Sequence, residues 1–176
     1  MKVLIVDNYY PEFLEKVEYD LAKKGIHGYK NIKREILRYK FGTSDYYSSN
    51  LIKNGVKAED IIINSILLQK TWAREHNCFL YLTCVLLEKI PKIKDVYRHI
   101  GNPLVLLAQI SQYKPDIIYV QCIGAFPLFL TRIMKGKCKH LVGQIASMFP
   151  SNEYFKNYDL VLSSLPNMVE AIIKIG

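Results

Sequence analysis

The chain opens with KVLIVD at residues 2–7, a run that is apolar on both faces until the carboxylate at its end. Such a run is typical of a strand in a parallel sheet that helices cover on both sides. Four more segments of this kind follow, at Glu59–Ile63, Asp116–Gln121, His140–Ile145 and Asp159–Ser163. These five segments predict an α/β fold with one mainly parallel sheet.

Helical spacing fills the segments between these strands. Apolar residues recur at Phe13, Val17 and Leu21 and again at Ile32 and Ile36, with basic residues on the opposite face. About fifty residues separate the first two strands, so two or three helices are expected there. Capping and breaking signals mark helix ends at Asn102-Pro103, Ser44-Asp45, Gly55 and Pro166. The alternation predicts a Rossmann-like, doubly wound sheet with helices on both faces, as a single domain over residues 1–176.

Composition and charge narrow the class of protein. Half of the 176 residues are apolar, which excludes disorder, and the net charge of +8 favours anionic partners such as nucleotides, nucleic acid or acidic lipid. The longest apolar run, Cys78–Leu87, has about half of the roughly 20 residues that a membrane-spanning helix needs. The first residues lack the pattern of a signal peptide, so a cytoplasmic location is expected. The four cysteines are predicted to be reduced and mostly buried, because none has a metal or redox spacing.

Several catalytic motifs are absent from the sequence. It has no GxxxxGK[ST] loop, no GxGxxG after the first strand, no GxSxG elbow and no HExxH. The four histidines are scattered at His27, His76, His99 and His140, and no His and Cys residues cluster with metal-site spacing. No metal site and no bound cofactor are therefore predicted for this chain.

The sheet itself predicts where a ligand binds. In doubly wound sheets, ligands lie beyond the carboxyl ends of the strands, near the point where the strand order reverses. The residues that follow the predicted strands are Asp7, Asn8 and Tyr9, Asn64, Gln121–Gly124, Gln144–Ser147 and Ser163–Pro166. Most are small or polar, as a ligand-facing edge requires, although loops are polar in any case.

Basic residues gather on one predicted helix, at Lys30, Lys33, Arg34, Arg38 and Lys40, and later at Lys89, Lys92, Lys94 and Arg98. One interpretation is a solvated helix surface. A second is that basic helices contact an anionic membrane at its periphery. A third, nucleic-acid binding, is weaker: Tyr29, Tyr39 and Tyr97 supply stacking aromatics, but no recognised binding motif is present.

Several sequence segments, taken together, resemble a known protein family. They are Asp7-Asn8-Tyr9-Tyr10, FGTSDYYSSNLIKNG at 41–55, AEDIIIN at 58–64, LQKTWARE at 68–75, KPDIIYVQ at 114–121, LVGQIAS at 141–147 and YDLVLSSLPNMVEAIIKIG at 158–176. The chain resembles the N-terminal half of a bacterial glycosyltransferase of the GT-B fold, of the group 1 or family-4-like kind. The resemblance covers nearly the whole chain and rests on the order of phrases rather than on a catalytic signature.

The resemblance implies the acceptor-side domain of an enzyme that transfers a sugar from a nucleotide-sugar donor to a glycan, lipid-linked or other acceptor. In that fold a second domain binds the donor and, in retaining members, carries a Glu-x7-Glu pair, so this chain alone is expected to be inactive. A C-terminal donor-binding domain is the expected partner. A stand-alone carbohydrate- or partner-binding module is the alternative.

The resemblance also implies which residues hold the acceptor, because sugars are bound by polar side chains and by aromatic stacking. The predicted acceptor-binding residues are Asp7, Asn8, Tyr9, Ser44, Asp45, Tyr46, Asn64, Gln121, Gly124, Gln144 and Ser147. Asp7 and Asp45 are the weak candidates for a catalytic base. Ser44, Asp45 and Asn64 have an alternative role as helix caps.

Overall fold

The computed structural model describes residues 1–92, 102–146 and 151–175. The chain folds into two compact units. The sheet unit consists of residues 1–7, 48–61 and 109–176, and the helical unit of residues 8–47 and 62–108. The single domain expected over residues 1–176 stays a prediction.

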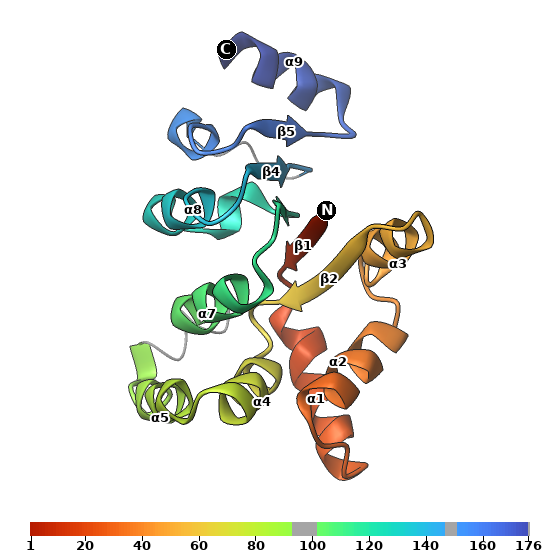
Figure 1. Cartoon of the computed structure of the whole chain (residues 1–176), viewed down its shortest axis with the longest axis vertical. Coiled ribbons are helices and arrows are strands. Elements are labelled where there is room, and N and C mark those ends of the chain that lie inside the picture. Colours follow the sequence, from red (N-terminus) through yellow and green to blue (C-terminus); the bar gives the residue numbers. More distant parts are fainter. Residues whose placement is uncertain (93–101, 147–150, 176) are drawn as a thin grey trace. The chain divides into compact units, whose positions relative to one another are not determined.

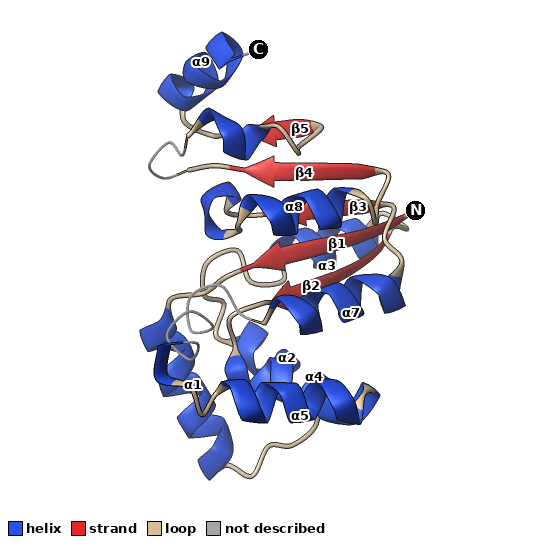
Figure 2. Cartoon of the chain, turned by 90° about the vertical axis from the view of Figure 1, so that its left-hand side faces the viewer, coloured by secondary structure: helices blue, strands red, loops and turns tan. Residues whose placement is uncertain are grey.

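The sheet has five parallel strands in the order β2-β1-β3-β4-β5 (Figure 2). Their bounds are Lys2–Asp7 for β1, Lys57–Ile62 for β2, Ile117–Val120 for β3, His140–Gln144 for β4 and Leu160–Leu162 for β5. All five predicted strands are therefore confirmed, with ends that differ by at most two residues. The α/β, Rossmann-like class of the fold is confirmed as well.

Helices cover both faces of this sheet. The Ser48–Lys53 part of α3 (Tyr46–Lys53) lies on one face, and α8 (Leu128–Lys135) and the Gln109–Tyr113 end of α7 (Pro103–Tyr113) lie on the other (Figure 1). Strand residues Val3–Val6 are all buried, as are Ile118 and Val120. Burial on both faces explains why these strands are apolar runs rather than alternating ones.

The helical unit has its own apolar core. Its helices are α1 (Pro11–Lys23), α2 (Tyr29–Arg38), α4 (Ile66–His76), α5 (Cys78–Leu87) and the start of α7. The core includes Leu14, Val17 and Leu21 from α1, Ile32 and Ile36 from α2, Leu68 and Trp72 from α4 and Cys84 from α5. The 3.6-residue spacing predicted for α1 and α2 is thus confirmed, and α1, α2 and α3 occupy the long first connection.

The helix boundaries follow their sequence signals. The Asn102 side chain accepts hydrogen bonds from the backbone N–H groups of Leu104 and Val105, at 3.0 and 3.4 Å, so it caps α7 as predicted. Gly55 follows α3 with a φ of 78°, a conformation that glycine adopts without strain. The last helix, α9 (Pro166–Ile175), begins at the predicted proline.

The prediction for the cysteines is wrong in part. Only Cys84 is buried; Cys122 and Cys138 are half-buried, and Cys78 is exposed at the start of α5. The apolar neighbours of Cys78 in the sequence misled the prediction, because part of α5 faces solvent.

Candidate functional site

Three polar side chains stand in one row at the carboxyl edge of the sheet. Val6 of β1 pairs with Val120 of β3, which pairs with Gly143 of β4. The residues that directly follow Val6, Val120 and Gly143 in the sequence are Asp7, Gln121 and Gln144. The Gln121 N–H donates a hydrogen bond to the Val6 carbonyl at 3.0 Å. Residues in register on parallel strands point to the same face, about 4.8 Å apart from strand to strand.

This row lies where the strand order reverses. The chain continues from β1 to β2 on one side and to β3 on the other, so β1 and β3 flank the switch point of the sheet. Asp7 and Gln121 stand at that point, and both are half-buried. The sheet unit therefore brings together three of the predicted acceptor-binding residues, Asp7, Gln121 and Gln144.

Tyr119 supports this row from within the strand. It lies two residues before Gln121 on the same face of β3, and its hydroxyl donates a hydrogen bond to the Gln144 side-chain oxygen. Tyr119 itself is buried. Because the Gln144 oxygen accepts this bond, the Gln144 NH₂ is the end of the amide turned away from Tyr119.

A short turn follows β3 and borders the site. Cys122 precedes a 3-10 helix at Ile123–Ala125, and Gly124 within it is exposed, with no atom within 4 Å of the position a Cβ would take. Burial raises the pKa of the Cys122 thiol, and the nearby charge of Asp7 raises it further. The thiol is therefore protonated at neutral pH and is a poor nucleophile.

The opposite face at this edge is tightly packed. A Cβ on Gly143 would lie 2.7 Å from a side-chain carbon of Ile123 and 2.8 Å from the ring of Tyr158. Burial raises the pKa of Tyr158, whose hydroxyl is buried and finds no hydrogen-bond partner among the described residues. Only glycine at 143 allows this approach, so the turn after β3 is held against β4.

In the helical unit, Tyr9 and Asn64 bind each other. The Tyr9 N–H donates to the Asn64 side-chain oxygen at 2.9 Å, and the Asn64 NH₂ donates to the Tyr9 carbonyl at 2.6 Å. Both residues are buried, whereas Asn8 between β1 and Tyr9 is half-buried. The paired bonds give Asn64 a structural task that joins the segment before α1 to the segment before α4.

Two of the predicted residues, Ser44 and Asp45, lie in the loop before α3, and Tyr46 is the first residue of α3. Ser44 has a φ of 48° and donates from its hydroxyl to the Leu37 carbonyl at 2.7 Å, and it is buried. Asp45 forms an ion pair with Lys40 at 2.6 Å, which lowers the pKa of Asp45. Tyr46 is exposed. Ser147, the remaining predicted residue, lies outside the described residues.

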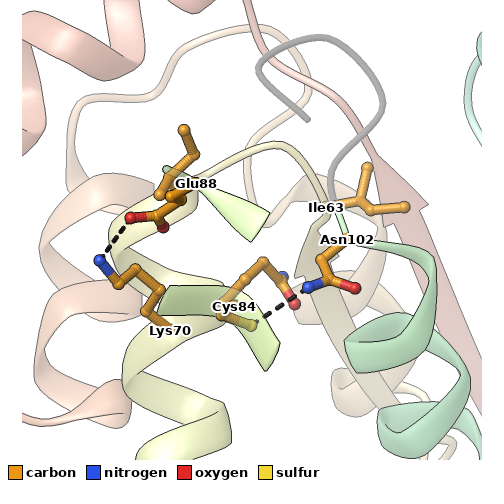
Figure 3. Close-up of a pocket in the computed structure, with 7 residues that line it drawn as sticks. Ile63, Lys70, Cys84, Glu88 and Asn102 are labelled. Atoms are coloured by element: carbon orange, nitrogen blue, oxygen red, sulfur yellow. Dashed lines mark hydrogen bonds and ion pairs between the residues drawn. The ribbon is translucent and has the colours of Figure 1, made fainter. Parts of the chain in front are cut away.

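The helical unit also holds a small pocket that the sequence did not indicate (Figure 3). Its polar lining includes two pairs: Lys70 and Glu88, ion-paired at 2.7 Å, and Asn102, whose NH₂ donates to the Cys84 sulfur at 3.1 Å. Its volume is about 20 Å³, room for one water. The Gln69 side-chain oxygen, also in the lining, is buried and has no hydrogen-bond partner among the described residues. The lining residues are spread over positions 63–102, and no sequence motif links them.

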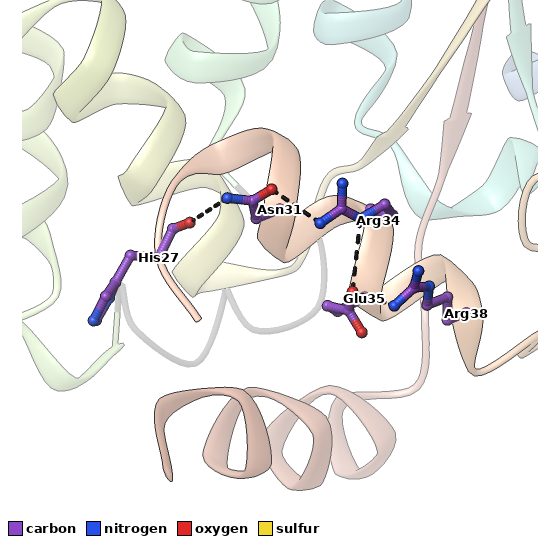
Figure 4. Close-up of polar contacts among 5 residues, drawn as sticks. All are labelled: His27, Asn31, Arg34, Glu35 and Arg38. Carbon is purple, nitrogen blue, oxygen red and sulfur yellow. Dashed lines mark hydrogen bonds and ion pairs between the residues drawn. The ribbon is translucent and has the colours of Figure 1, made fainter. Parts of the chain in front are cut away.

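The basic face predicted on α2 lines a hollow of about 240 Å³. Its lining residues are Lys30, Lys33, Arg34, Leu37, Arg38, Lys40 and Asp45. Two of the arginines share one carboxylate: Glu35 lies 2.7 Å from Arg38 and 3.6 Å from Arg34, and Arg34 also donates to the side chain of Asn31 (Figure 4). Cations outnumber carboxylates here, so the hollow has a positive potential.

The described residues contain no group of three or more His, Cys, Asp and Glu side chains placed to hold a metal ion. None of their helices combines the length and the apolar character that crossing a bilayer requires.

Comparisons with protein-family models, with curated proteins and with solved structures returned no match for this chain. The glycosyltransferase resemblance therefore rests on the phrases of the sequence. Chemically, the row at the sheet edge offers one carboxylate and two amides, which is a set suited to binding hydroxyl groups.

Proposed function

We propose that the chain is the acceptor-side domain of a glycosyltransferase and binds a hydroxylated acceptor at the carboxyl edge of its sheet. The observation that supports this is the row of Asp7, Gln121 and Gln144 across three adjacent strands at the switch point. Doubly wound sheets bind their ligands at this place. The same residues lie in the phrases that resemble the glycosyltransferase family.

The chemistry of the row matches that of a sugar. A carboxylate accepts hydrogen bonds from hydroxyl groups, and an amide both donates and accepts them. Side chains on adjacent strands can therefore form hydrogen bonds with neighbouring hydroxyl groups of one sugar ring. Asp7 is the anionic member, and in this proposal it holds an acceptor hydroxyl. Transfer would need a nucleotide-sugar donor and a donor-binding domain as partner, and this chain alone is expected to be inactive.

The test is saturation-transfer NMR of the whole chain with small sugars, using the monosaccharides glucose and N-acetylglucosamine and the disaccharide maltose as probes. Because a hydrogen bond to a charged group contributes about 1.5–3 kcal/mol, Asp7→Asn is expected to weaken binding of the preferred sugar by about tenfold or more. Asp20→Asn, a change of the same kind on the half-buried Asp20 of α1, is the matched control and should leave the affinity unchanged.

Two outcomes would count against the proposal. One is that none of the sugars binds more strongly than a polyol such as glycerol. The other is that Asp7→Asn and Asp20→Asn affect binding equally, which would place the sugar away from the sheet edge. Binding that depends on Asp7 fits both an acceptor-side domain and a stand-alone carbohydrate-binding module, and turnover of a nucleotide sugar when a donor-binding domain is added would favour the acceptor-side domain.

A second candidate function, binding of a nucleic acid, is favoured by one observation. Five cations line the hollow on α2, and such a surface attracts polyanions. If this function holds, a DNA or RNA oligonucleotide will bind with an affinity that falls steeply with salt, and Lys30→Gln with Lys33→Gln will reduce the salt dependence. Salt-insensitive or absent binding would remove this candidate.

A further inference from the structure

Helix α5 exposes a stripe of large apolar side chains. Phe79, Leu82 and Leu86 of α5, with Ile90 just after it, each have between 47 % and 72 % of their surface exposed. Their spacing of three, four and four residues places them on one side of the helix. These four side chains are called the α5 stripe.

The other side of α5 is already used. Cys84 belongs to the core of the helical unit, and Leu80 and Tyr81 pack against that core. The ten residues of α5, CFLYLTCVLL, include no charged side chain. Burying a large apolar side chain is favourable, so four such side chains exposed together form a surface that is stabilised when it is covered.

The charged residues beside the α5 stripe favour an anionic surface as its binding partner. Glu88 is the only acidic residue between positions 78 and 92, and Lys70 neutralises it in an ion pair. Lys89 and Lys92, on the same segment, are exposed. The stripe is therefore flanked by two exposed lysines that form no ion pair with a carboxylate among the described residues, on a chain whose net charge is +8.

An apolar surface bordered by lysines is complementary to an anionic lipid bilayer. A helix of ten residues is about 15 Å long, too short to span the bilayer, but it can lie in the plane of the headgroups. Its apolar side chains then enter the acyl boundary while the lysine ammonium groups reach the lipid phosphates.

We propose that α5 docks this protein on an anionic membrane surface, with the α5 stripe inserted and Lys89 and Lys92 at the phosphates. The interaction is independent of the proposed acceptor site, since it uses no residue of the sheet edge. The sequence predicted membrane contact through basic helices; the α5 stripe adds an apolar anchor to that prediction.

The test is co-sedimentation of the full chain with vesicles of phosphatidylcholine, with and without phosphatidylglycerol. The wild-type protein is expected to bind the anionic vesicles at least tenfold more strongly than the neutral ones. Phe79→Glu with Leu86→Glu should reduce binding to anionic vesicles at least tenfold, because each change removes an apolar anchor and adds repulsion. Both side chains are exposed, so circular dichroism and the thermal midpoint should stay unchanged.

The matched control is Phe129→Glu. Phe129 lies on α8 in the sheet unit and is 60 % exposed, so the same substitution is made outside the α5 stripe and should leave binding unchanged. A second variant, Lys89→Gln with Lys92→Gln, tests the charges while keeping the stripe: binding to anionic vesicles should fall about tenfold and lose much of its salt dependence.

Three results would overturn the proposal. The first is that the wild-type protein does not bind anionic vesicles. The second is that Phe79→Glu with Leu86→Glu binds as well as Phe129→Glu does. The third is a concentration-dependent dimer, seen by light scattering, that the stripe variant converts to a monomer, since the cover would then be a second copy of this chain.

Discussion

The sheet unit and the helical unit both bury apolar side chains, but they differ in how the sequence reveals them. In the sheet unit, the strands bury aliphatic residues such as Leu4 and Ile118, and its polar contacts lie both at strand ends, such as that between the Lys2 N–H and Asp116 at 2.8 Å, and within strands, such as that between Ser48 and the buried Asp60 of β2. In the helical unit, buried polar side chains bind distant backbone groups: Asn64 binds Tyr9.

The difference shows where sequence information lies. A strand that is buried on both faces requires only aliphatic side chains, so an apolar run in the sequence is enough to predict it. The role of a buried polar residue depends on its hydrogen-bond partner, and the partner of Asn64 is 55 residues away along the chain. Substitutions in the two units should therefore destabilise the protein for different reasons.

The largest effect is expected at Asn64 in the helical unit. Asn64→Ala removes two buried hydrogen bonds to the Tyr9 backbone, and we expect it to lower the free energy of unfolding by about 3 kcal/mol. Urea unfolding followed by the fluorescence of Trp72, which is buried in the same unit, measures this. Asn31→Ala, at an exposed asparagine of α2, is the control and should cost about 0.5 kcal/mol or less. Equal costs would contradict the structural role of Asn64.

The next effect is expected at Gly143 in the sheet unit, where close packing is the cause. Gly143→Ala forces a methyl group to within 2.8 Å of Ile123 and Tyr158, and such overpacking costs about 2 kcal/mol. Circular dichroism during urea unfolding measures the loss. Gly124→Ala, at the same edge but with no atom within 4 Å, should change the free energy of unfolding by less than about 0.5 kcal/mol. If both variants are equally stable, the close approach of the turn to β4 does not exist.

Much of the fold could be predicted from the sequence. The five strands and the periodic helices α1 and α2 were found because burial leaves a local, periodic record. The cysteine at 78 was misjudged, because an apolar neighbourhood along the chain does not reveal which side of a helix faces solvent. For the same reason the apolar run at residues 78–87 does not reveal from sequence which of its side chains form the α5 stripe.

The candidate site was predictable only as a set of loops. The rule for strand ends pointed to Asp7, Gln121 and Gln144, but their alignment in one row depends on the register between strands, which no local pattern encodes. The pairing of Tyr119 with Gln144 depends on it too. The pocket around Cys84 left no signal, since its residues become neighbours only when α4, α5 and α7 pack.

A smaller effect is expected at Glu18, whose carboxyl accepts a hydrogen bond from Ser65 at 2.6 Å. Burial raises the pKa of Glu18 above its usual 4.5. The folded state therefore holds this proton more tightly than the unfolded state, so stability falls as the pH rises through 4.5 to the folded-state pKa. Glu18→Gln should flatten this dependence and raise the free energy of unfolding at pH 7 by up to about 1 kcal/mol. Urea unfolding at pH 5 and pH 7 measures both, and a steeper dependence in the variant would contradict the burial.

The smallest effect is expected at Asp45, which tests whether the polar contacts of the helical unit matter at its surface as they do in its interior. Lys40 lowers the pKa of Asp45, so the ion pair stabilises the fold above the unfolded-state pKa of 3.8, and this stability is lost as the pH falls through the folded-state pKa. Solvent screens the pair, whose lysine is 68 % exposed. Asp45→Asn should therefore lower the free energy of unfolding at pH 7 by about 0.3 kcal/mol, and by nothing measurable at pH 2. A loss above about 1 kcal/mol in urea unfolding would show that this surface contact is as strong as the buried pair of Tyr9 and Asn64.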